Sequence, residues 1–515
     1  MCPNQNYSAF MNILFITVDQ WRGECLSALD HPVVKTPNLD ALAQEGVLFK
    51  QHFAQATPCA PSRTSIHTGM YLHNHRCVSN GTPVDKRLNN WALEMRKAGY
   101  SPSLFGYTDT APDPRGVDPS DPRLTQYCEP LPGIGSYTPY KEEVSMDWVQ
   151  SLITKGYEIP ERLWSLYGNA VEGIDWKDGG DRLLPLNIKT EDHETHFMVN
   201  KCIEWIDGQR QPWVTHLSLL RPHPPFVAPA PYHEFCDPAQ QASPTRCDSA
   251  NEEGQQHPFL KYCIDQTNYG APESVKAIQQ AKAHYYGLMS EVDDNLGRLI
   301  EQLKTSGEWD STLIILTSDH GEQMGDHWLT SKLGYFDQSY HIPLIIRDPR
   351  ANADASRGKQ IDAFTENVDI MPTMLDWLGR DIPAQCDGHS LLPILQSGVE
   401  PNSWRKQVHW EYDFRSVEDD SVERYFGLTA HQCSLSVIRD KRYKYVHFTA
   451  LPPLFFDLQE DPGEFINLAD KADYQSLVLE YTQKMLSWRM NHTDRGLTET
   501  FLSDNGPVTR RSPLQ

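Results

Sequence analysis

The sequence predicts an α/β protein with a large, mostly parallel sheet flanked by helices and a smaller C-terminal domain built on an antiparallel sheet. Three observations support this prediction. Short apolar runs alternate with helical patterns in the first part of the chain, which is typical of buried parallel strands joined by helices. Past about residue 400 the apolar pattern changes to period two. The 515 residues also exceed what one core usually serves, so we expect two domains.

The first part of the chain repeats an order of strand and helix. The strand NILFITVD ends at Asp19, and the helix TPNLDALAQEG that follows closes on Gly46. The later strand patterns are VLFKQHFAQ, SPSLFGYTD, WVTHLSLLRPH and STLIILTSDHG, with the helix WALEMRKAGY before the second of them. The strongest helix prediction covers residues 274–307, because their apolar side chains recur at three-and-four spacing.

The C-terminal part has a different organisation. Four period-two patterns, KQVHWEYDF, CSLSVIRD, RYKYVHFTA and PLFFDLQED, predict an antiparallel meander, and a final helix is predicted at about 473–489. We therefore place a large α/β domain at residues 1–395, a smaller antiparallel α+β domain at 396–489 and a polar tail at 490–515. Residues 110–200 are rich in Pro, Gly and Asp, which predicts a loop-rich insertion laid over the large domain.

Composition and charge narrow the classes of partner. The formal charge of -23 repels nucleic-acid backbones and anionic membranes, so we expect neither partner. The longest apolar run near the N-terminus, FMNILFITV, has the features of neither a signal peptide nor a membrane span. The 11 cysteines include no C-x-x-C pair, which fits neither a disulfide framework nor a zinc knuckle. We therefore expect a cytoplasmic protein with reduced thiols.

Two strand patterns each deliver an aspartate at their carboxyl end. Asp19 follows FITV, and Asp319 follows LTS and precedes His320. If the two strands are neighbours, these side chains converge at the edge of the sheet where ligands bind. Two unpaired carboxylates repel each other, so we expect a cation, and oxygen ligands with one imidazole suit Mn²⁺ or Ca²⁺. The alternative is that each aspartate caps the next element, which is the better interpretation of either one alone.

The stretch QATPCAPSRTSIHTGMYLHNH predicts an anion-binding helix N-terminus. Pro61 suits a first helical position, which places Cys59 at the mouth of the helix, where free N–H groups favour an anion. Arg63 adds a planar group suited to phosphate or sulfate oxygens. The alternative for any single cysteine is a role in core packing. We interpret His67, His73 and His75 as structural or rim residues.

These residues carry a resemblance to a known family. Cys59-Ala60-Pro61-Ser62-Arg63, with Thr68-Gly69 beyond, resembles the C-x-P-S-R…T-G signature of the type I sulfatases in the alkaline phosphatase superfamily. The resemblance extends over nearly the whole chain through NILFITVDQ, TPNLDALAQEG, RPHPPF, TSDHGEQMGDH, VDIMPTMLDWLG and LFFDLQEDPGEFINLA. Gln20 after Asp19, the GYTD strand end and Asn80 make the chain similar to the phosphonate monoester hydrolase branch.

The resemblance implies roles for individual residues. One divalent metal ion would be held by Asp19, Cys59, Asp319 and His320. The pocket for the anion and the leaving group would be lined by Gln20, Arg63, Asn80, Tyr107, His223 and Lys332. Asp109 stands where the branch tends to have threonine, and a carboxylate there opposes an anionic substrate unless it points away or is paired.

The resemblance also implies a mechanism. A formylglycine-generating enzyme would oxidise Cys59 to formylglycine, and the hydrated aldehyde would attack a small anionic ester through one hydroxyl on the metal and expel the product group through the other. Arg63 and Lys332 would stabilise the charged transition state, and His223 is the candidate proton donor to the leaving oxygen.

Three functions remain open from the sequence. The first is a hydrolase of phosphonate monoesters and phosphodiesters with sulfatase activity as a side reaction, and the second is an arylsulfatase. The third is a non-catalytic anion-binding protein or a metal-independent cysteine protein. We also expect the tail at 490–515 to contact a neighbouring subunit of a homo-oligomer, a dimer or a tetramer, although a disordered tail is the alternative.

Overall fold

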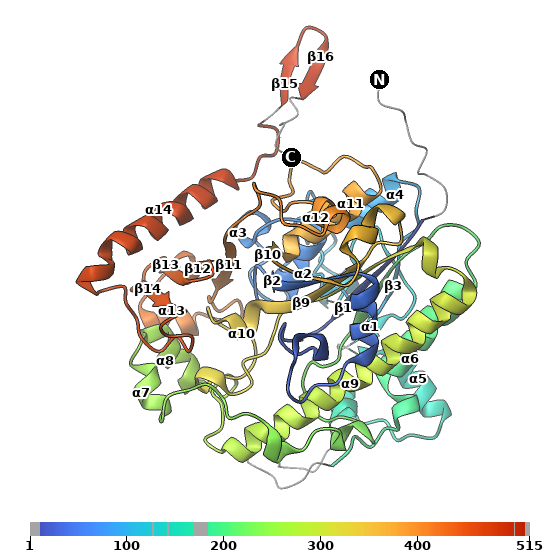
Figure 1. Cartoon of the computed structure of the whole chain (residues 1–515), viewed down its shortest axis with the longest axis horizontal. Helices are drawn as coiled ribbons and strands as arrows, with labels where there is room; N and C mark the ends of the chain where they lie inside the picture. Colours follow the sequence, from blue (N-terminus) through green and yellow to red (C-terminus); the bar gives the residue numbers. More distant parts are fainter. Residues whose placement is uncertain (1–10, 126–127, 142–143, 169–183, 499, 510–515) are drawn as a thin grey trace.

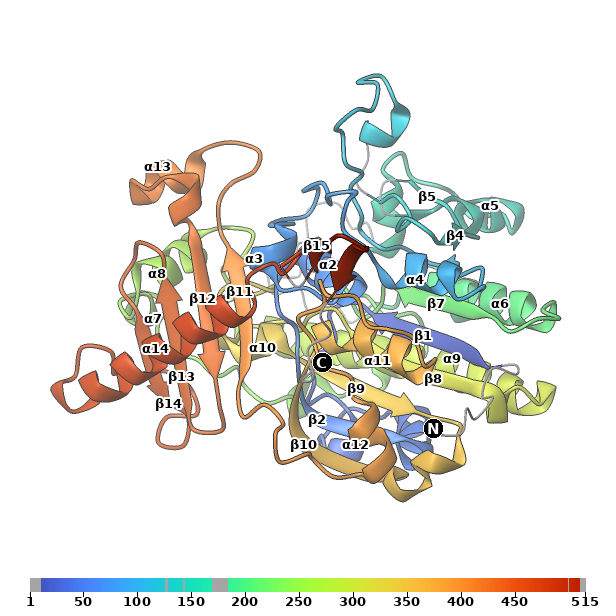
Figure 2. The ribbon, with the colours of Figure 1, turned by 90° about the horizontal axis from the view of Figure 1, so that it is seen from above.

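A computed structural model describes residues 11–125, 128–141, 144–168, 184–498 and 500–509. An eight-stranded sheet forms its centre, with helices on both faces, and a separate four-stranded sheet lies to one side (Figures 1 and 2). The strands of the large sheet are, in spatial order, β10 (Lys359–Glu366), β2 (Val47–Phe53), β9 (His341–Arg347), β8 (Thr312–Ser318), β1 (Asn12–Val18), β7 (Val214–Leu219), β3 (Ser103–Phe105) and β4 (Gly135–Ser136). The predicted fold class is confirmed.

The central strands of the large sheet are parallel. β1 lies between β7 and β8, and the register pairs Val18 with both Leu219 and Ser318. Asp19 and Asp319 therefore leave the sheet side by side, as expected from their places after two apolar runs. β9 runs antiparallel to its neighbours β2 and β8, so the sheet is mostly and not wholly parallel.

The two faces of the sheet bury separate clusters of apolar side chains. Leu14 and Ile16 of β1 pack with α1 (Pro37–Glu45), α6 (Glu194–Asp207) and the long α9 (Val275–Ser306) on one face. Ile13 and Phe15 point to the other face, which is covered by α2 (Cys59–Thr68), α4 (Trp91–Lys97), α11 (Ile370–Trp377) and α12 (Leu392–Ser397). The alternation along β1 fixes both layers because successive strand residues point to opposite faces. Within the described ranges, no helix has the length and apolarity needed to cross a bilayer.

The small sheet is the predicted antiparallel meander. Its strands are β11 (Val408–Asp413), β12 (Ser434–Arg439), β13 (Tyr443–Phe448) and β14 (Leu454–Asp457). One face packs against α14 (Gln475–Asn491) through Tyr481, Met485 and Trp488, and the other packs toward Phe53 and Tyr340 of the large domain. Beyond α14, a hairpin of β15 (Thr500–Ser503) and β16 (Gly506–Thr509) projects from the body (Figure 1).

The stretch 110–200 holds more regular structure than its composition predicts. It contains β5 (Tyr140–Lys141), β6 (Val144–Ser145) and α5 (Met146–Thr154), and β4 joins the edge of the large sheet. Ser145 caps α5 by accepting a hydrogen bond from the N–H of Trp148 at 3.4 Å. Elements this short give too few repeats for a periodicity to stand out. The remaining described helices are α3 (Leu72–His75), α7 (Ala250–Gly254), α8 (Pro258–Asp265), α10 (Asp337–Tyr340) and α13 (Ser421–Phe426).

Candidate active site

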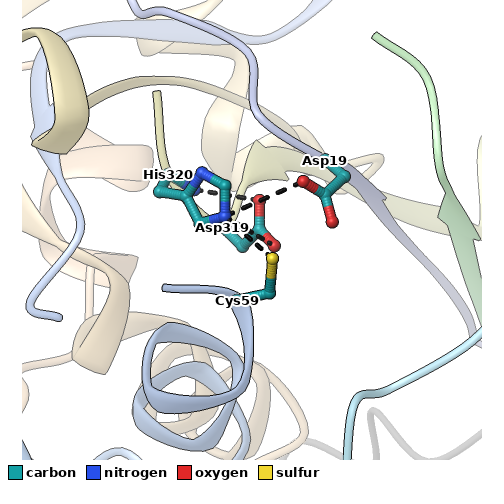
Figure 3. A group of neighbouring side chains, drawn as sticks. All are labelled: Asp19, Cys59, Asp319 and His320. Carbon is teal, nitrogen blue, oxygen red and sulfur yellow. Dashed lines mark hydrogen bonds and ion pairs between the residues drawn. The ribbon is translucent and has the colours of Figure 1, made fainter. Parts of the chain in front are cut away.

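Four donor side chains converge at the carboxyl edge of the central strands (Figure 3). Asp19 follows β1, Asp319 and His320 follow β8, and Cys59 is the first residue of α2. One ligand atom from each of the four lies within 4.8 Å of the others, and all four residues are buried. The Cys59 Sγ lies 3.1 Å from Nε2 of His320. The structure therefore brings together the whole metal-ligand set that the sequence analysis predicts.

The start of α2 differs from the expectation built on Pro61. The helix begins at Cys59, two residues earlier than a helix with Pro61 in first position. The reason is a cap from outside the local sequence, since Oδ1 of Asn80 accepts a hydrogen bond from the N–H of Ala60 at 3.0 Å. Cys59 thus occupies the first helical turn itself, and Asn80 both holds that turn and lines the cavity above it.

A divalent cation fits these four residues. Oδ1 of Asp19 is buried and has no hydrogen-bond partner among the described residues, which leaves it available as a ligand. Nδ1 of His320 donates to the carbonyl of Gly321 at 3.1 Å, so its Nε2 carries a lone pair toward the cluster. Burial, and then the charge of Asp19, raise the pKa of Asp319 above its usual range. Two neighbouring buried carboxylates repel each other when both are ionised, and a bound cation would stabilise the doubly ionised pair.

Arg63 contacts both carboxylates of the cluster. Its Nε donates to Asp319 at 2.9 Å, and its Nη2 donates to Asp19 at 3.1 Å. Its Nη1 donates to the hydroxyl of Ser218 at 2.8 Å, and the side chain is 1% exposed. In this arrangement the guanidinium orients the carboxylates of Asp19 and Asp319, with its donors directed at protein oxygens.

Tyr107 and Asp109 complete the surroundings of Arg63. The hydroxyl of Tyr107 donates to Oδ2 of Asp19 at 2.5 Å, and its ring lies 4.3 Å from Cζ of Arg63. Asp109 is buried, and its Oδ2 lies 3.6 Å from Nε of Arg63. This carboxylate is paired with Arg63, but Asp19 and Asp319 lie closer to the same guanidinium. One positive charge is shared among three carboxylates, so the charge of Asp109 is only partly compensated.

Gln20, Lys332 and His223 form a second polar group beside the cluster. Nζ of Lys332 donates to Oε1 of Gln20 at 2.6 Å and to Nε2 of His223 at 3.1 Å. Nδ1 of His223 donates to the carbonyl of Pro224 at 2.7 Å, so its Nε2 is an acceptor. Burial, and then the charge of Lys332, lower the pKa of His223 to about 3, which keeps the imidazole neutral.

A cavity opens over the cluster. It is lined by Asp19, Cys59, Asn80, Tyr107, Asp109, Trp164, Leu220 and His223. Trp164 and Leu220 form an apolar wall that the sequence analysis missed, and the Trp164 ring stands nearly perpendicular to the His223 ring at 5.9 Å. Leu220 belongs to the quoted strand pattern, but Trp164 lies in the aperiodic stretch 110–200, where no pattern marks it. An apolar wall beside charged groups suits an ester with an organic substituent.

The remaining histidines of the motif region are structural. His67 accepts a hydrogen bond from the indole of Trp91 at 3.0 Å, and His75 bonds to Ser65 at 3.0 Å. His73 lies 2.8 Å from a carboxylate oxygen of Glu411 in the small sheet. The ten cysteines within the described residues are all free thiols. Burial, and then the charge of Asp19, raise the pKa of the Cys59 thiol well above its usual range, which disfavours an unmodified thiolate nucleophile.

Comparison with known proteins identifies the family of the chain. The profile of the Sulfatase family matches residues 11–380, and that of the N-sulphoglucosamine sulphohydrolase C-terminal region matches residues 325–491. The chain is 43% identical to the multifunctional alkaline phosphatase superfamily protein PehA of Trinickia caryophylli, over 97% of this chain and 99% of that protein.

Two solved structures have the same fold over nearly their whole length. The phosphonate monoester hydrolase of Agrobacterium radiobacter superimposes with a TM-score of 0.91 at 43% identity, covering 98% of this chain and all of that one. The phosphonate monoester hydrolase of Silicibacter pomeroyi gives a TM-score of 0.88 at 38% identity, covering 97% and 99%. The chain therefore belongs to the sulfatase family of the alkaline phosphatase superfamily.

Proposed function

We propose that this protein hydrolyses phosphonate monoesters and phosphodiesters, with sulfatase activity as a side reaction. The observation that carries the proposal is the buried cluster of Asp19, Cys59, Asp319 and His320, of which Asp19 and Cys59 line an open cavity. The names of the similar proteins support the same ester class. The family implies formylglycine and a divalent metal ion, and the oxygen-rich donor set favours Mn²⁺ or Ca²⁺.

The two implied groups supply complementary chemistry. Asp19, Asp319 and His320, together with position 59, would hold the metal ion, which would supply Lewis-acid chemistry toward the ester. Formylglycine at position 59 would supply a hydrated aldehyde as the nucleophile. A formylglycine-generating enzyme is the partner that this maturation requires.

The protein's own residues bind and orient the ester. Asn80 and Tyr107 line the cavity with neutral polar groups, and Trp164 with Leu220 provides space for the organic substituent. Arg63 holds the carboxylates of Asp19 and Asp319 in place. His223 is the proposed donor to the leaving oxygen; this role requires the imidazole to take up a proton from solvent when the ester binds, because in this structure its Nε2 accepts from Lys332 and carries no proton.

The charge of the cavity predicts which esters react. A phosphonate monoester, a phosphodiester and a sulfate monoester each carry one negative charge at neutral pH, whereas a phosphate monoester approaches two. Arg63 is already paired with carboxylates, whereas Lys332 and Arg221, both beside His223, have no ion pair among the described residues. We expect kcat/KM to rank phosphonate monoester and phosphodiester first, sulfate ester lower, and phosphate monoester below the diester.

One activity panel on a single preparation tests this ranking. The arylsulfatase alternative becomes the right one if the sulfate ester outruns both singly charged phosphorus esters by about tenfold or more, a transition-state preference of about 1.4 kcal/mol. The non-catalytic alternative requires no turnover of any ester, and the intact set of site residues speaks against it.

We also propose the assembly and location of the protein. The division into domains at 1–395 and 396–489, with the insertion at 110–200, is kept as a proposal, as are the cytoplasmic location and a dimer or tetramer. The tail supports an oligomer because it exposes Leu497 at 81%, Phe501 at 58% and Leu502 at 82%. Apolar side chains exposed together mark interaction surfaces.

Deletion of residues 492–515 tests the role of the tail. We expect the shortened chain to lose its native oligomeric mass in light scattering, because the exposed apolar side chains of the hairpin are removed. The full-length chain with Leu497 and Leu502 both changed to serine is the matched variant and should behave alike. A shortened chain that keeps the native mass would contradict the proposed contact.

A further inference from the structure

Glu322 is a buried carboxylate to which the proposed reaction assigns no role. It lies in the loop after β8 and is 1% exposed. Both of its oxygens accept hydrogen bonds: Oε1 from the backbone N–H groups of Met324 at 2.9 Å and Ser331 at 2.6 Å, and Oε2 from Nε2 of Gln20. A buried carboxylate is costly unless it is well bonded, so these contacts show what the side chain does.

The contact with Gln20 fixes the direction of an amide. Oε1 of Gln20 accepts from Nζ of Lys332 at 2.6 Å, while Nε2 of the same amide faces Glu322. A carboxylate only accepts hydrogen bonds and an ammonium only donates them. One of the two amide orientations satisfies both neighbours, and the presence of Glu322 selects it. The oxygen of Gln20 is thereby directed at Lys332.

The contacts with the backbone fix the loop that carries Lys332. Ser331, the residue before Lys332, has a φ of 70°, and Met324 has a φ of 48°. Both lie in the left-handed region, which is disfavoured for residues with a Cβ atom. Because Oε1 of Glu322 binds both N–H groups, it stabilises this conformation at two of the four non-glycine residues of the loop that have a positive φ, the other two being His327 and Trp328.

Lys332 is thus held from two sides by one carboxylate. We propose that Glu322 is a positioning residue that determines, through Gln20 and through Ser331, where Lys332 presents its positive charge to the ester. Two of the three N–H groups of Lys332 donate to Gln20 and His223. Because an ammonium group is tetrahedral, these two hydrogen bonds also determine the direction of the third N–H group. The inference rests on the proposed function in one respect, that the substrate is an anionic ester.

The substitution Glu322→Gln tests the proposal with almost no change in volume. The new amide oxygen can still accept from Met324 and Ser331, but its NH₂ group then faces the NH₂ group of Gln20. Gln20 must turn over or withdraw, and Lys332 loses its acceptor. We expect kcat/KM for the singly charged ester that the wild type prefers to fall about 10- to 100-fold, as for other residues that orient groups at metal sites. A phosphate monoester should lose a larger factor, because its higher charge depends more on Lys332.

A matched control separates positioning from general stability. Glu253 is also buried and contacts the same loop, with Oε1 lying 2.7 Å from Nδ1 of His327 and Oε2 accepting from the N–H of Cys247 at 2.8 Å. It touches neither Gln20 nor Lys332 in the structure. Glu253→Gln should lower the melting temperature while kcat/KM per folded, metal-loaded molecule stays within about twofold of the wild type for both esters.

A reciprocal exchange provides a rescue. In Glu322→Gln with Gln20→Glu, the carboxylate at position 20 accepts from Lys332 and from the new amide, whose oxygen still accepts from Met324 and Ser331. This double variant should regain about tenfold or more of the activity lost by Glu322→Gln alone, since contacting residues are energetically coupled. If Glu322→Gln does not fold, Gln20→Leu interrupts the same connection and should show the same loss and the same charge dependence.

Three results would overturn the proposal: a folded Glu322→Gln protein with wild-type kcat/KM, equal losses for esters of both charges, or a double variant no better than the single one. Wild-type activity tests the proposed function separately, because every comparison here is a ratio to the wild type on the same ester. A wild type that prefers sulfate esters would change the function and leave the test of Glu322 intact.

Discussion

Replacement of Cys59 by alanine is expected to lower kcat by about 10⁴-fold or more, the scale of losing a covalent nucleophile. Cys59 stands at the first position of α2, within ligand distance of Asp19, Asp319 and His320, and alanine offers no group that can be oxidised to an aldehyde. The fold should survive, because alanine suits the first turn of a helix. Circular dichroism and steady-state kinetics on the same sample measure both effects.

Cys202 provides the matched control for that substitution. It is 0% exposed in α6 and packs in the apolar cluster on the sheet face opposite α2, so Cys202→Ala should reduce only the free energy of unfolding, by about 1 kcal/mol. Mass spectrometry of the tryptic peptide that ends at Arg63 should show the mass of an aldehyde in place of the thiol in active wild-type enzyme. Full activity with an unmodified Cys59 would disprove the mechanism.

Substitution of Asp319 by asparagine is expected to remove the bound cation together with nearly all activity. The change deletes one charged ligand and leaves Asp19, whose Oδ1 has no other hydrogen-bond partner among the described residues, without its cation. Added Mn²⁺ or Ca²⁺ should raise the melting temperature of metal-free wild type, since a ligand that binds only the folded state stabilises it. The variant should show no such shift.

The control for Asp319 is Asp348, a buried aspartate after the far end of β9. It bonds to Arg350 at 2.7 Å and lies outside the ligand cluster. The Asp348→Asn variant loses an ion pair, but it should keep its activity and a stoichiometric amount of metal. Kinetics and elemental analysis measure these two properties. Active wild-type enzyme without stoichiometric divalent metal would contradict the paired-strand interpretation itself.

Much of the fold could be predicted because its signals are local. Apolar runs located β1, β7 and β8, three-and-four spacing located α9, and the change to period two located the small sheet. The convergence of Asp19 and Asp319 followed from parallel strands that end at one edge. β9 and β10 gave no separate prediction, because the short apolar run of β9 does not distinguish a strand from a buried helical segment and β10 is too polar to show an apolar run.

The directions of the side chains could not be predicted from the sequence. Arg63 suits an anionic substrate by its chemistry, but the structure directs its donors at Asp19, Asp319 and Ser218, which come from three different strand ends. The roles of Trp164 and Glu322 could not be predicted for the same reason. They depend on neighbours that are distant in the chain or on a loop with unusual backbone angles. Spacing locates a residue along the chain, and only tertiary contacts determine what it faces.

The burial of α2 bears on whether Cys59 is modified before or after the protein folds. Every residue of this helix is buried, and Cys59 is 4% exposed. An enzyme that oxidises the thiol must reach it, and the folded protein leaves it almost no exposed surface. If Cys59 is converted as proposed, we therefore expect the conversion to occur before this segment folds. In a chain that folds first, Cys59 would stay an unmodified thiol. The fraction of active protein in a preparation would then depend on the rate of modification relative to the rate of folding in the producing cell.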